Sequence, residues 1–398
     1  MARKEGVLKK MRKILIVLLM VSFASTGLLM SQDEFKPNFD FKGSRFAAGY
    51  LDSQTDGAFH KGSYQVPDTK LRFNWNIIPD ATIVTRMSLN DSTFKEIDYL
   101  YIDYKDLFVN LSPSVKDSFF NPKVRMGRFK LETGEETWSN NGVESVVISN
   151  SASNFNATDE GIQFSGTVKK EQLGIPMKWS LSFTNANSGT GKDDEQGKAI
   201  CFKIAANPVP ELYASATYFN SYDIGANDAE ASYAGLKTRP TNATVWTRKI
   251  TEINLRYDFQ PGKEDRLNPG APAWSDSKGF IRVAYGNFVD NGDDEVAPIL
   301  VVTKRDGKYY FIEGCYNATE KVYLAARQSN IAFDDSDMFA SLNGVNANEY
   351  TRTSLGVGYR LSDKTHIKVE SMSNSEDVPT GTDEPDNNQF SLLITAKF

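Results

Sequence analysis

Cysteine and histidine are scarce in this chain, which has two of each among its 398 residues. Cys201 and Cys315 lie 114 positions apart, each inside a strand-like segment, so the sequence predicts neither a disulfide framework nor a metal-binding pair. His60 falls in a predicted loop and His366 at the start of a predicted strand, which indicates neither a metal cluster nor a Ser/His catalytic pair. We therefore expect no cofactor, no metal and no enzymatic activity.

Long hydrophobic runs are also missing after residue 31, where no stretch approaches the roughly 20 apolar residues that a membrane-spanning helix needs. The sequence has no glycine-rich phosphate-binding loop, no coiled-coil repeat and no patch typical of nucleic-acid binding. Acidic residues outnumber basic ones, 51 against 45, which disfavours polyanionic partners. We expect no nucleic-acid partner and no helical membrane domain.

The first 31 residues have a different composition. Six basic residues precede the apolar stretch ILIVLLMVSF, and small residues follow it, which is the layout of a secretory signal peptide. Met11 is an alternative start, cleavage after Ser31 or Gly27 fits the pattern, and a retained membrane anchor is the competing interpretation. We predict a signal peptide at 1–31 and a mature protein at 32–398, in which the loss of six bases and one acid leaves 39 basic and 50 acidic residues.

Apolar and polar residues alternate along most of the mature chain. TKLRFNWNI (69–77) and EINLRYDF (252–259) follow a period of two throughout, and the terminal NNQFSLLITAKF breaks it only at Leu393. Successive side chains of a strand point to opposite faces, so each such segment predicts a strand with one apolar and one polar face. Seventeen segments have this pattern, and we assign the weakest, 299–304, to a loop. The sixteen predicted strands are 42–52, 69–78, 81–90, 96–105, 122–131, 160–170, 176–185, 198–207, 211–221, 247–260, 278–289, 308–317, 320–330, 350–361, 364–373 and 388–398.

The connections between these strands fall into two classes. Short turns rich in Pro, Asn, Asp and Ser occur at 77–81, 206–211, 317–321 and 361–364. Long polar connections occur at 51–67, 132–158, 186–197, 222–245, 290–307, 331–348 and 374–387. Short turns at one end and long loops at the other are typical of an outer-membrane barrel.

We therefore predict an all-β fold, a transmembrane antiparallel up-and-down β-barrel of sixteen strands. In hydrocarbon every backbone N–H and C=O must be paired within the protein, so the last strand must pair with the first. A soluble β-sandwich predicts the same alternation and is the competing fold.

Two parts of the sequence resemble known outer-membrane proteins. The chain ends on Phe398, preceded by apolar residues at every second position, which resembles the terminal signature that the assembly machinery of the Gram-negative outer membrane reads. The segments YQVPDTKLRFNWNIIPDATIVTRMSLND, EIDYLYIDYK and PKVRMGRFKLETGEETWSNNG, within roughly residues 64–155, resemble the first half of the phosphate-selective porin O and P family.

The resemblance implies a sixteen-stranded, homotrimeric porin whose third loop, near 132–158, folds inward and narrows the channel. It also implies two partners, the outer-membrane lipid and the barrel assembly machinery, which would bind through Phe398. In the family this loop has a more basic neighbourhood, whereas this chain has four acids there, so phosphate selectivity does not follow from the resemblance. These constriction-loop acids are Glu132, Glu135, Glu136 and Glu144.

The polar face of each predicted strand would line the interior of the barrel. This interior is then basic, with Asp258 and Glu370 as its acids, because most acids gather in loops such as 191–198, 291–295 and 374–388. A basic wall opposite an acidic loop predicts a transverse field that favours polar solutes, and solvated side chains without a selective role are the alternative. The predicted pore-lining basic residues are Lys70, Arg72, Arg86, Arg125, Lys169, Lys178, Arg256, Arg282, Arg352, Arg360 and Lys368.

These observations predict a porin of a Gram-negative outer membrane, a water-filled channel through which small hydrophilic solutes or ions diffuse passively. Anions such as phosphate are candidate solutes. The main alternative is a non-conducting barrel that acts as an adhesin or a structural protein through its external loops. A barrel phospholipase is the enzymatic alternative, and assays of lipid hydrolysis with each histidine replaced would test it.

Overall fold

The computed structural model describes residues 36–53, 62–89, 97–109, 112–116, 121–139, 141–153, 155, 157–186, 197–222, 224–225, 245–260, 277–292, 304–334, 339–340, 346–378, 380–381, 383–384 and 386–397. The predicted signal peptide at 1–31, His60 and Phe398 lie outside the described residues. Among the described residues, no helix has both the length and the apolar character required to cross a membrane.

Sixteen long strands form the body of the described structure. They are β2 (Arg45–Ser53), β3 (Ser63–Ile78), β4 (Ala81–Ser88), β5 (Ile97–Tyr104), β6 (Lys123–Lys130), β7 (Thr158–Val168), β8 (Met177–Thr184), β9 (Ala199–Val209), β10 (Leu212–Asn220), β12 (Val245–Phe259), β13 (Gly279–Gly292), β14 (Lys304–Asn317), β15 (Val322–Phe333), β18 (Glu349–Ser362), β19 (Thr365–Asp377) and β20 (Gln389–Lys397). The short elements are β1 (Asn38–Phe41), β11 (Ile224–Gly225), β16 (Phe339–Ala340), β17 (Asn346–Ala347), α2 (Lys170–Leu173), η1 (Pro113–Val115) and η2 (Glu136–Trp138).

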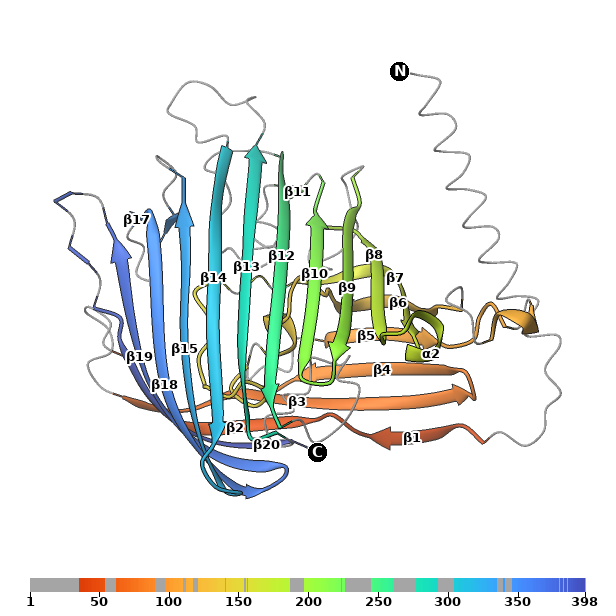
Figure 1. The fold of residues 1–398 in the computed structure, drawn as a ribbon, viewed down its shortest axis with the longest axis horizontal. Coiled ribbons are helices and arrows are strands. Elements are labelled where there is room, and N and C mark those ends of the chain that lie inside the picture. Colours follow the sequence, from red (N-terminus) through yellow and green to blue (C-terminus); the bar gives the residue numbers. More distant parts are fainter. Residues whose placement is uncertain are drawn as a thin grey trace.

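The sheet closes on itself. Each long strand pairs antiparallel with its neighbours in the chain, and β20 pairs both with β19 and with β2, where Ala48 lies opposite Ile394. In Figure 1, β3 and β4 run across the direction of β10–β14, as strands in opposite walls of a tilted barrel do. The predicted sixteen-stranded antiparallel barrel is therefore confirmed, and the sandwich alternative is wrong.

The outer face of the barrel is apolar and uncovered. Leu255, Leu355 and Ile394 are 47%, 61% and 49% exposed. Arg256, Ser354 and Leu393, which adjoin them in sequence, are buried on the inner face. A sandwich would hide such residues between two sheets, whereas a barrel in a bilayer presents them to lipid. Cys201 and Cys315 are free thiols, buried in the inner face.

The sixteen predicted strands all exist, with ends displaced by a few residues. β1, which pairs with β3 through Phe39 and Trp75, was not predicted, because it is only four residues long. The expected rule of short turns at one end holds for the connections after β3, β9, β14 and β18. It fails at that same end for 105–122 and 260–278, which are as long as the loops of the opposite end.

Candidate functional site

The connection between β6 and β7, residues 131–157, lies inside the barrel; we call it the inner loop (Figure 1). Its apolar residues contact three parts of the inner wall. Phe155 packs on Tyr309, with ring centroids 4.6 Å apart, and on Phe288. The other two contacts are Val146 and Val147 with Phe280 and Tyr323, and Val143 and Ile148 with Ala47 and Leu393. The loop therefore crosses the interior and is attached to the wall at three places.

The carboxylate of Glu135 is bound by the wall opposite the start of the loop. Lys203 of β9 lies 2.6 Å away, and the hydroxyls of Tyr213 and Ser215 of β10 donate hydrogen bonds of 2.5 and 2.8 Å. Burial alone would raise the pKa of Glu135, but the Lys203 charge and these hydrogen bonds hold the pKa below its ordinary value. Glu135 is therefore a buried anion in an ion pair.

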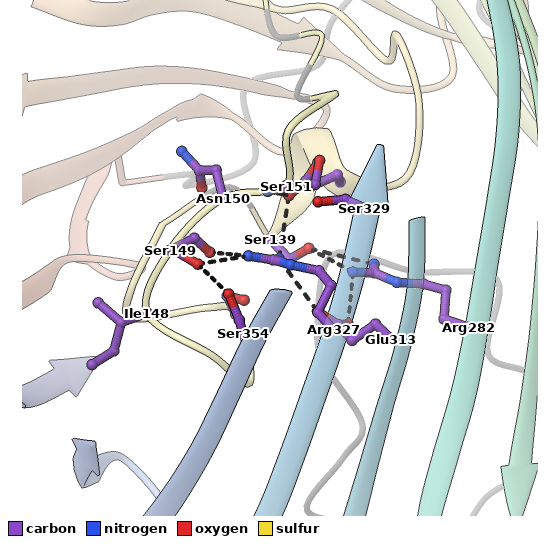
Figure 2. A network of polar contacts seen from close by, with 12 residues as sticks. Ser139, Ile148, Ser149, Asn150, Ser151, Arg282, Glu313, Arg327, Ser329 and Ser354 are labelled. Carbon is purple, nitrogen blue, oxygen red and sulfur yellow. Dashed lines mark hydrogen bonds and ion pairs between the residues drawn. The ribbon is translucent and has the colours of Figure 1, made fainter. Parts of the chain in front are cut away.

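Glu136 pairs with Arg327 and so joins the inner loop to β15. Figure 2 shows Arg327 with Ser149 of the loop and Glu313 of the wall. The Arg327 guanidinium lies 3.3 Å from Glu136 and 3.4 Å from Glu313 of β14, and it donates to the backbone carbonyl of Ser149. Nearby, Arg282 of β13 donates to Ser139 and, at 2.8 Å, to Glu313 (Figure 2). Arg327 thus binds two separate parts of the inner loop, at Glu136 and at Ser149.

Charged side chains of β18 and β19 bind the backbone of the inner loop. The Lys368 ammonium donates to three carbonyls, those of Gly142, Val143 and Ser145. Glu370 accepts from the backbone N–H groups of Ile148 and Ser149, and Arg352 donates to the carbonyl of Asn150 at 2.9 Å. These contacts satisfy backbone groups that an irregular segment leaves open.

The remaining two loop acids also face the wall. Glu144 pairs with Lys397 of β20 at 2.9 Å, and Glu132 accepts a hydrogen bond of 3.2 Å from Ser180 of β8. The four predicted constriction-loop acids thus bind groups on five different strands, β8, β9, β10, β15 and β20. The geometry differs from the expected one, in which these acids stand across open water from a basic wall, because their carboxylates are used to attach the loop.

A cavity of about 380 Å³ lies between the inner loop and the wall formed by β2–β6, β19 and β20. Its charged wall carries four bases and two acids in close pairs. Arg45 lies 2.5 Å from Asp68, while Asp98 is shared by Lys70 at 2.9 Å and Arg86 at 2.6 Å. Lys130, at the end of β6, also lines the cavity.

The opposite side of the cavity is mostly neutral. The inner loop contributes Asn141, Gly142, Ile148, Ser149 and Asn150, and none of the four loop acids lines it. Glu370 also lines the cavity, but it is buried and its oxygens accept hydrogen bonds from the loop.

The other predicted pore-lining residues are spread around the barrel. Arg125 pairs with Asp103, Arg256 with Asp258, and Arg72 donates to Asn74, each on the inner face. Arg360 donates to Asn317 near the short-turn end, and Lys178 is half-buried on β8. Lys169 is exposed in the turn before α2, beyond the end of β7. Only Lys70 and Arg86 of the eleven come together at the cavity.

Several inner charges were not predicted. Lys203, Arg248 and Arg327 share the inner parity of their strands, so the alternation could have found them. Asp98 could not be found this way. Arg86 pairs with Tyr99 and Met87 with Ile97, so Asp98 is the extra residue of a β-bulge, and an unbroken period of two does not place it beside Tyr99.

Within the described residues, no group of three or more His, Cys, Asp and Glu side chains is arranged to hold a metal ion. His366 is buried on the inner face of β19, opposite Arg360.

No family model and no curated protein matches the sequence. Solved structures match the fold. The outer membrane channel DcaP of Acinetobacter baumannii is 13% identical, with a TM-score of 0.58 over 93% of this chain and 99% of that chain. An anion-selective porin from Comamonas acidovorans is 10% identical, with a TM-score of 0.57 over 91% and 100%. OmpT of Vibrio cholerae, in a trimer form, is 12% identical, with a TM-score of 0.56 over 92% and 100%. At these identities the likeness establishes a porin-like barrel fold.

Proposed function

We propose that this protein is an outer-membrane porin, a channel for the passive diffusion of small hydrophilic solutes or ions. The observation that carries the proposal is the division of the barrel interior. The inner loop is attached mainly to strands between β8 and β20, and a charged cavity stays beside the wall of β2–β6. An apolar outer face, a closed sheet and a polar interior suit a water-filled pore through a bilayer.

The proposal places the protein in a Gram-negative outer membrane, in contact with its lipid, after export through the signal peptide at 1–31. Phe398 would be read by the barrel assembly machinery. A homotrimer is part of the proposal, supported by the trimer form of the structurally similar OmpT. Anions such as phosphate are the proposed solutes, supported by the basic residues of the inner wall and by the likeness to an anion-selective porin.

Planar-bilayer recording of the purified, folded chain tests the channel directly. Stepwise, ohmic conductance is expected, whereas a silent membrane in the presence of the folded barrel would favour the adhesin or structural alternative. To locate the passage, Gln389→Trp adds bulk at the cavity and should lower the unitary conductance. Ser371→Trp, on the exposed outer face of β19, is the matched control and should leave it unchanged.

A further inference from the structure

The cavity beside β2–β6 has a charged side and a neutral polar side. Four bases and two acids stand on the β2–β6 side: Arg45, Lys70, Arg86, Lys130, Asp68 and Asp98. The inner loop and β20 form the neutral side, with carboxamides and hydroxyls from Asn141, Ser149, Asn150, Gln389 and Ser391. A ligand that contacts both sides must have a charge at one end and hydrogen-bonding groups along the rest of its body.

The charged side favours an anion. Asp98 is shared between Lys70 and Arg86, so this group of three has an excess of one positive charge, whereas Arg45 and Asp68 balance each other. A guanidinium has five N–H donors and an ammonium has three, so the ion pairs with Asp98 leave donors for a second carboxylate. A ligand with one carboxylate would balance the excess charge.

Aliphatic side chains offer a ligand little contact in this cavity. Ile148 and Leu393 are 9% and 1% exposed, and they pack in a cluster with Ala47 and Val143. An apolar ligand body would therefore lie against carboxamides and hydroxyls and displace water from them. It could not replace the hydrogen bonds of that water, which is unfavourable.

Two carboxamides of the neutral side are half-buried and keep hydrogen-bonding capacity for a ligand. Asn141 Oδ1 accepts from the backbone N–H groups of Val143 and Glu144, which holds the side chain in place and leaves its NH2 group to donate. Gln389 Nε2 donates to Ser391 at 3.0 Å, which leaves Oε1 to accept. A hydroxyl group both donates and accepts, so a hydroxylated ligand body can bind both carboxamides.

We propose that this cavity is a binding subsite for hydroxylated carboxylates, the class to which sugar acids belong. The carboxylate binds at Lys70 and Arg86, and the hydroxyl groups bind at Asn141 and Gln389. The inference rests on the proposed channel function, since it names the class of anion that the passage binds best.

D-gluconate is the probe. Hexanoate is the carboxylate of equal chain length without hydroxyl groups, and D-glucose has the hydroxyl groups without the charge. Each is added at neutral pH to single channels that carry chloride current in planar bilayers, and inorganic phosphate is added as the competing anion. Gluconate should block the current at concentrations at least about tenfold lower than hexanoate or glucose, because only gluconate binds both sides of the cavity.

Two variants separate the two sides. Gln389→Met keeps the length of the side chain but removes the carboxamide, so it should weaken the gluconate block by about threefold and leave the hexanoate block unchanged. Gln328→Met makes the same change on the exposed outer face of β15 and should alter neither block. Lys70→Gln should weaken the block by both carboxylates, by about tenfold. Its control, Lys249→Gln, removes a lysine that is exposed on β12, away from the cavity.

Equal block by gluconate and hexanoate, or by gluconate and glucose, would overturn the subsite while the conductance itself kept the channel function intact. A stronger block by phosphate than by gluconate would do the same, as would a gluconate block that Gln389→Met leaves unchanged. Absence of any conductance would instead count against the proposed function.

Discussion

Lys203 of β9 and Glu135 of the inner loop form an ion pair of 2.6 Å in which only 3% and 1% of the two side chains are exposed. Two hydroxyl groups donate to the same carboxylate oxygen, Oε1, and the backbone N–H of Glu135 donates to Glu252 of β12. Gly134 precedes this contact with φ +148°, and a Cβ there would lie 2.6 Å from a Glu252 oxygen. The start of the inner loop is therefore fitted closely to the wall.

The first prediction concerns the stability of this pair. Glu135→Gln should destabilise the folded barrel by about 3 kcal/mol, because it leaves Lys203 buried without its counter-charge. The double variant Glu135→Gln with Lys203→Met should recover most of the lost stability, because it removes the unpaired buried charge. Denaturant unfolding in detergent micelles, followed by tryptophan fluorescence, measures both.

Glu144→Gln is the matched control, since its partner Lys397 is 45% exposed and a pair of that kind contributes less than about 1 kcal/mol. Equal losses for Glu135→Gln and Glu144→Gln would show that the Lys203 pair does not fasten the loop.

The second prediction is a loosening of the inner loop in acid. The groups that face Glu135 are Lys203 from β9, Tyr213 and Ser215 from β10, and Glu252 from β12. The folded pKa of Glu135 is lowered, because the Lys203 charge and its hydrogen bonds outweigh the effect of burial. The stability from this pair is therefore complete above the ordinary glutamate value of about 4.3 and is lost as the pH falls through the lower folded value.

Open-channel current noise, recorded while the pH is lowered stepwise from neutrality, should stay constant to about pH 4 and then rise. Glu135→Gln should have the higher noise already at neutral pH and lack the acid-induced step. A step that persists in this variant would assign the transition to another group.

Much of this architecture follows from sequence alternation, and the reason is physical. A strand between lipid and water alternates apolar and polar side chains. The sequence therefore assigns Leu255 and Tyr257 to the outer face and Arg256 to the inner face, as the structure shows. Lys70 and Arg86 were assigned to the inner face in the same way, and both line the cavity.

The alternation of apolar and polar residues could not predict which groups the loop acids bind. These acids lie in an irregular segment, whose side chains do not point to alternate faces. Glu135 and Lys203 are 68 positions apart, and only the closed fold brings them together. The inward position of Asp98 depends on a β-bulge in β5, which the alternation does not reveal. The sequence therefore predicted a basic wall facing an acidic loop, whereas Asp68 and Asp98 lie on the same side of the cavity as the bases.

The third prediction follows for ion selectivity. Asp98→Asn should raise the permeability ratio of chloride to potassium by about twofold, because it leaves Lys70 and Arg86 uncompensated at the cavity. Glu144→Gln removes a loop acid that is paired with Lys397 and does not line the cavity, so the ratio should hardly change. Reversal potentials in a salt gradient measure both. A larger change of the permeability ratio for Glu144→Gln than for Asp98→Asn would contradict this prediction. It would favour the arrangement predicted from the sequence, a basic wall opposite an acidic loop.

The fourth prediction tests whether the inner loop stays on the wall while the channel conducts. The hydroxyl oxygens of Ser149 in the loop and Ser354 in β18 are 2.9 Å apart, so a cysteine at each position would place the two sulfur atoms close together (Figure 2). Ser149→Cys combined with Ser354→Cys should form the bond on oxidation, detectable by mass spectrometry.

Because Arg327, Arg352 and Glu370 already hold residues 148–150, closing this bond should leave the unitary conductance unchanged. Reduction of the same channels, and oxidation of Ser149→Cys alone, are the controls, and the native cysteines are buried. A conductance that drops on oxidation and returns on reduction would mean that the loop leaves the wall during conduction. The ion pairs between the inner loop and the wall would then break during conduction. The selectivity of the channel would be determined by a second conformation, in which the loop has moved away from the wall.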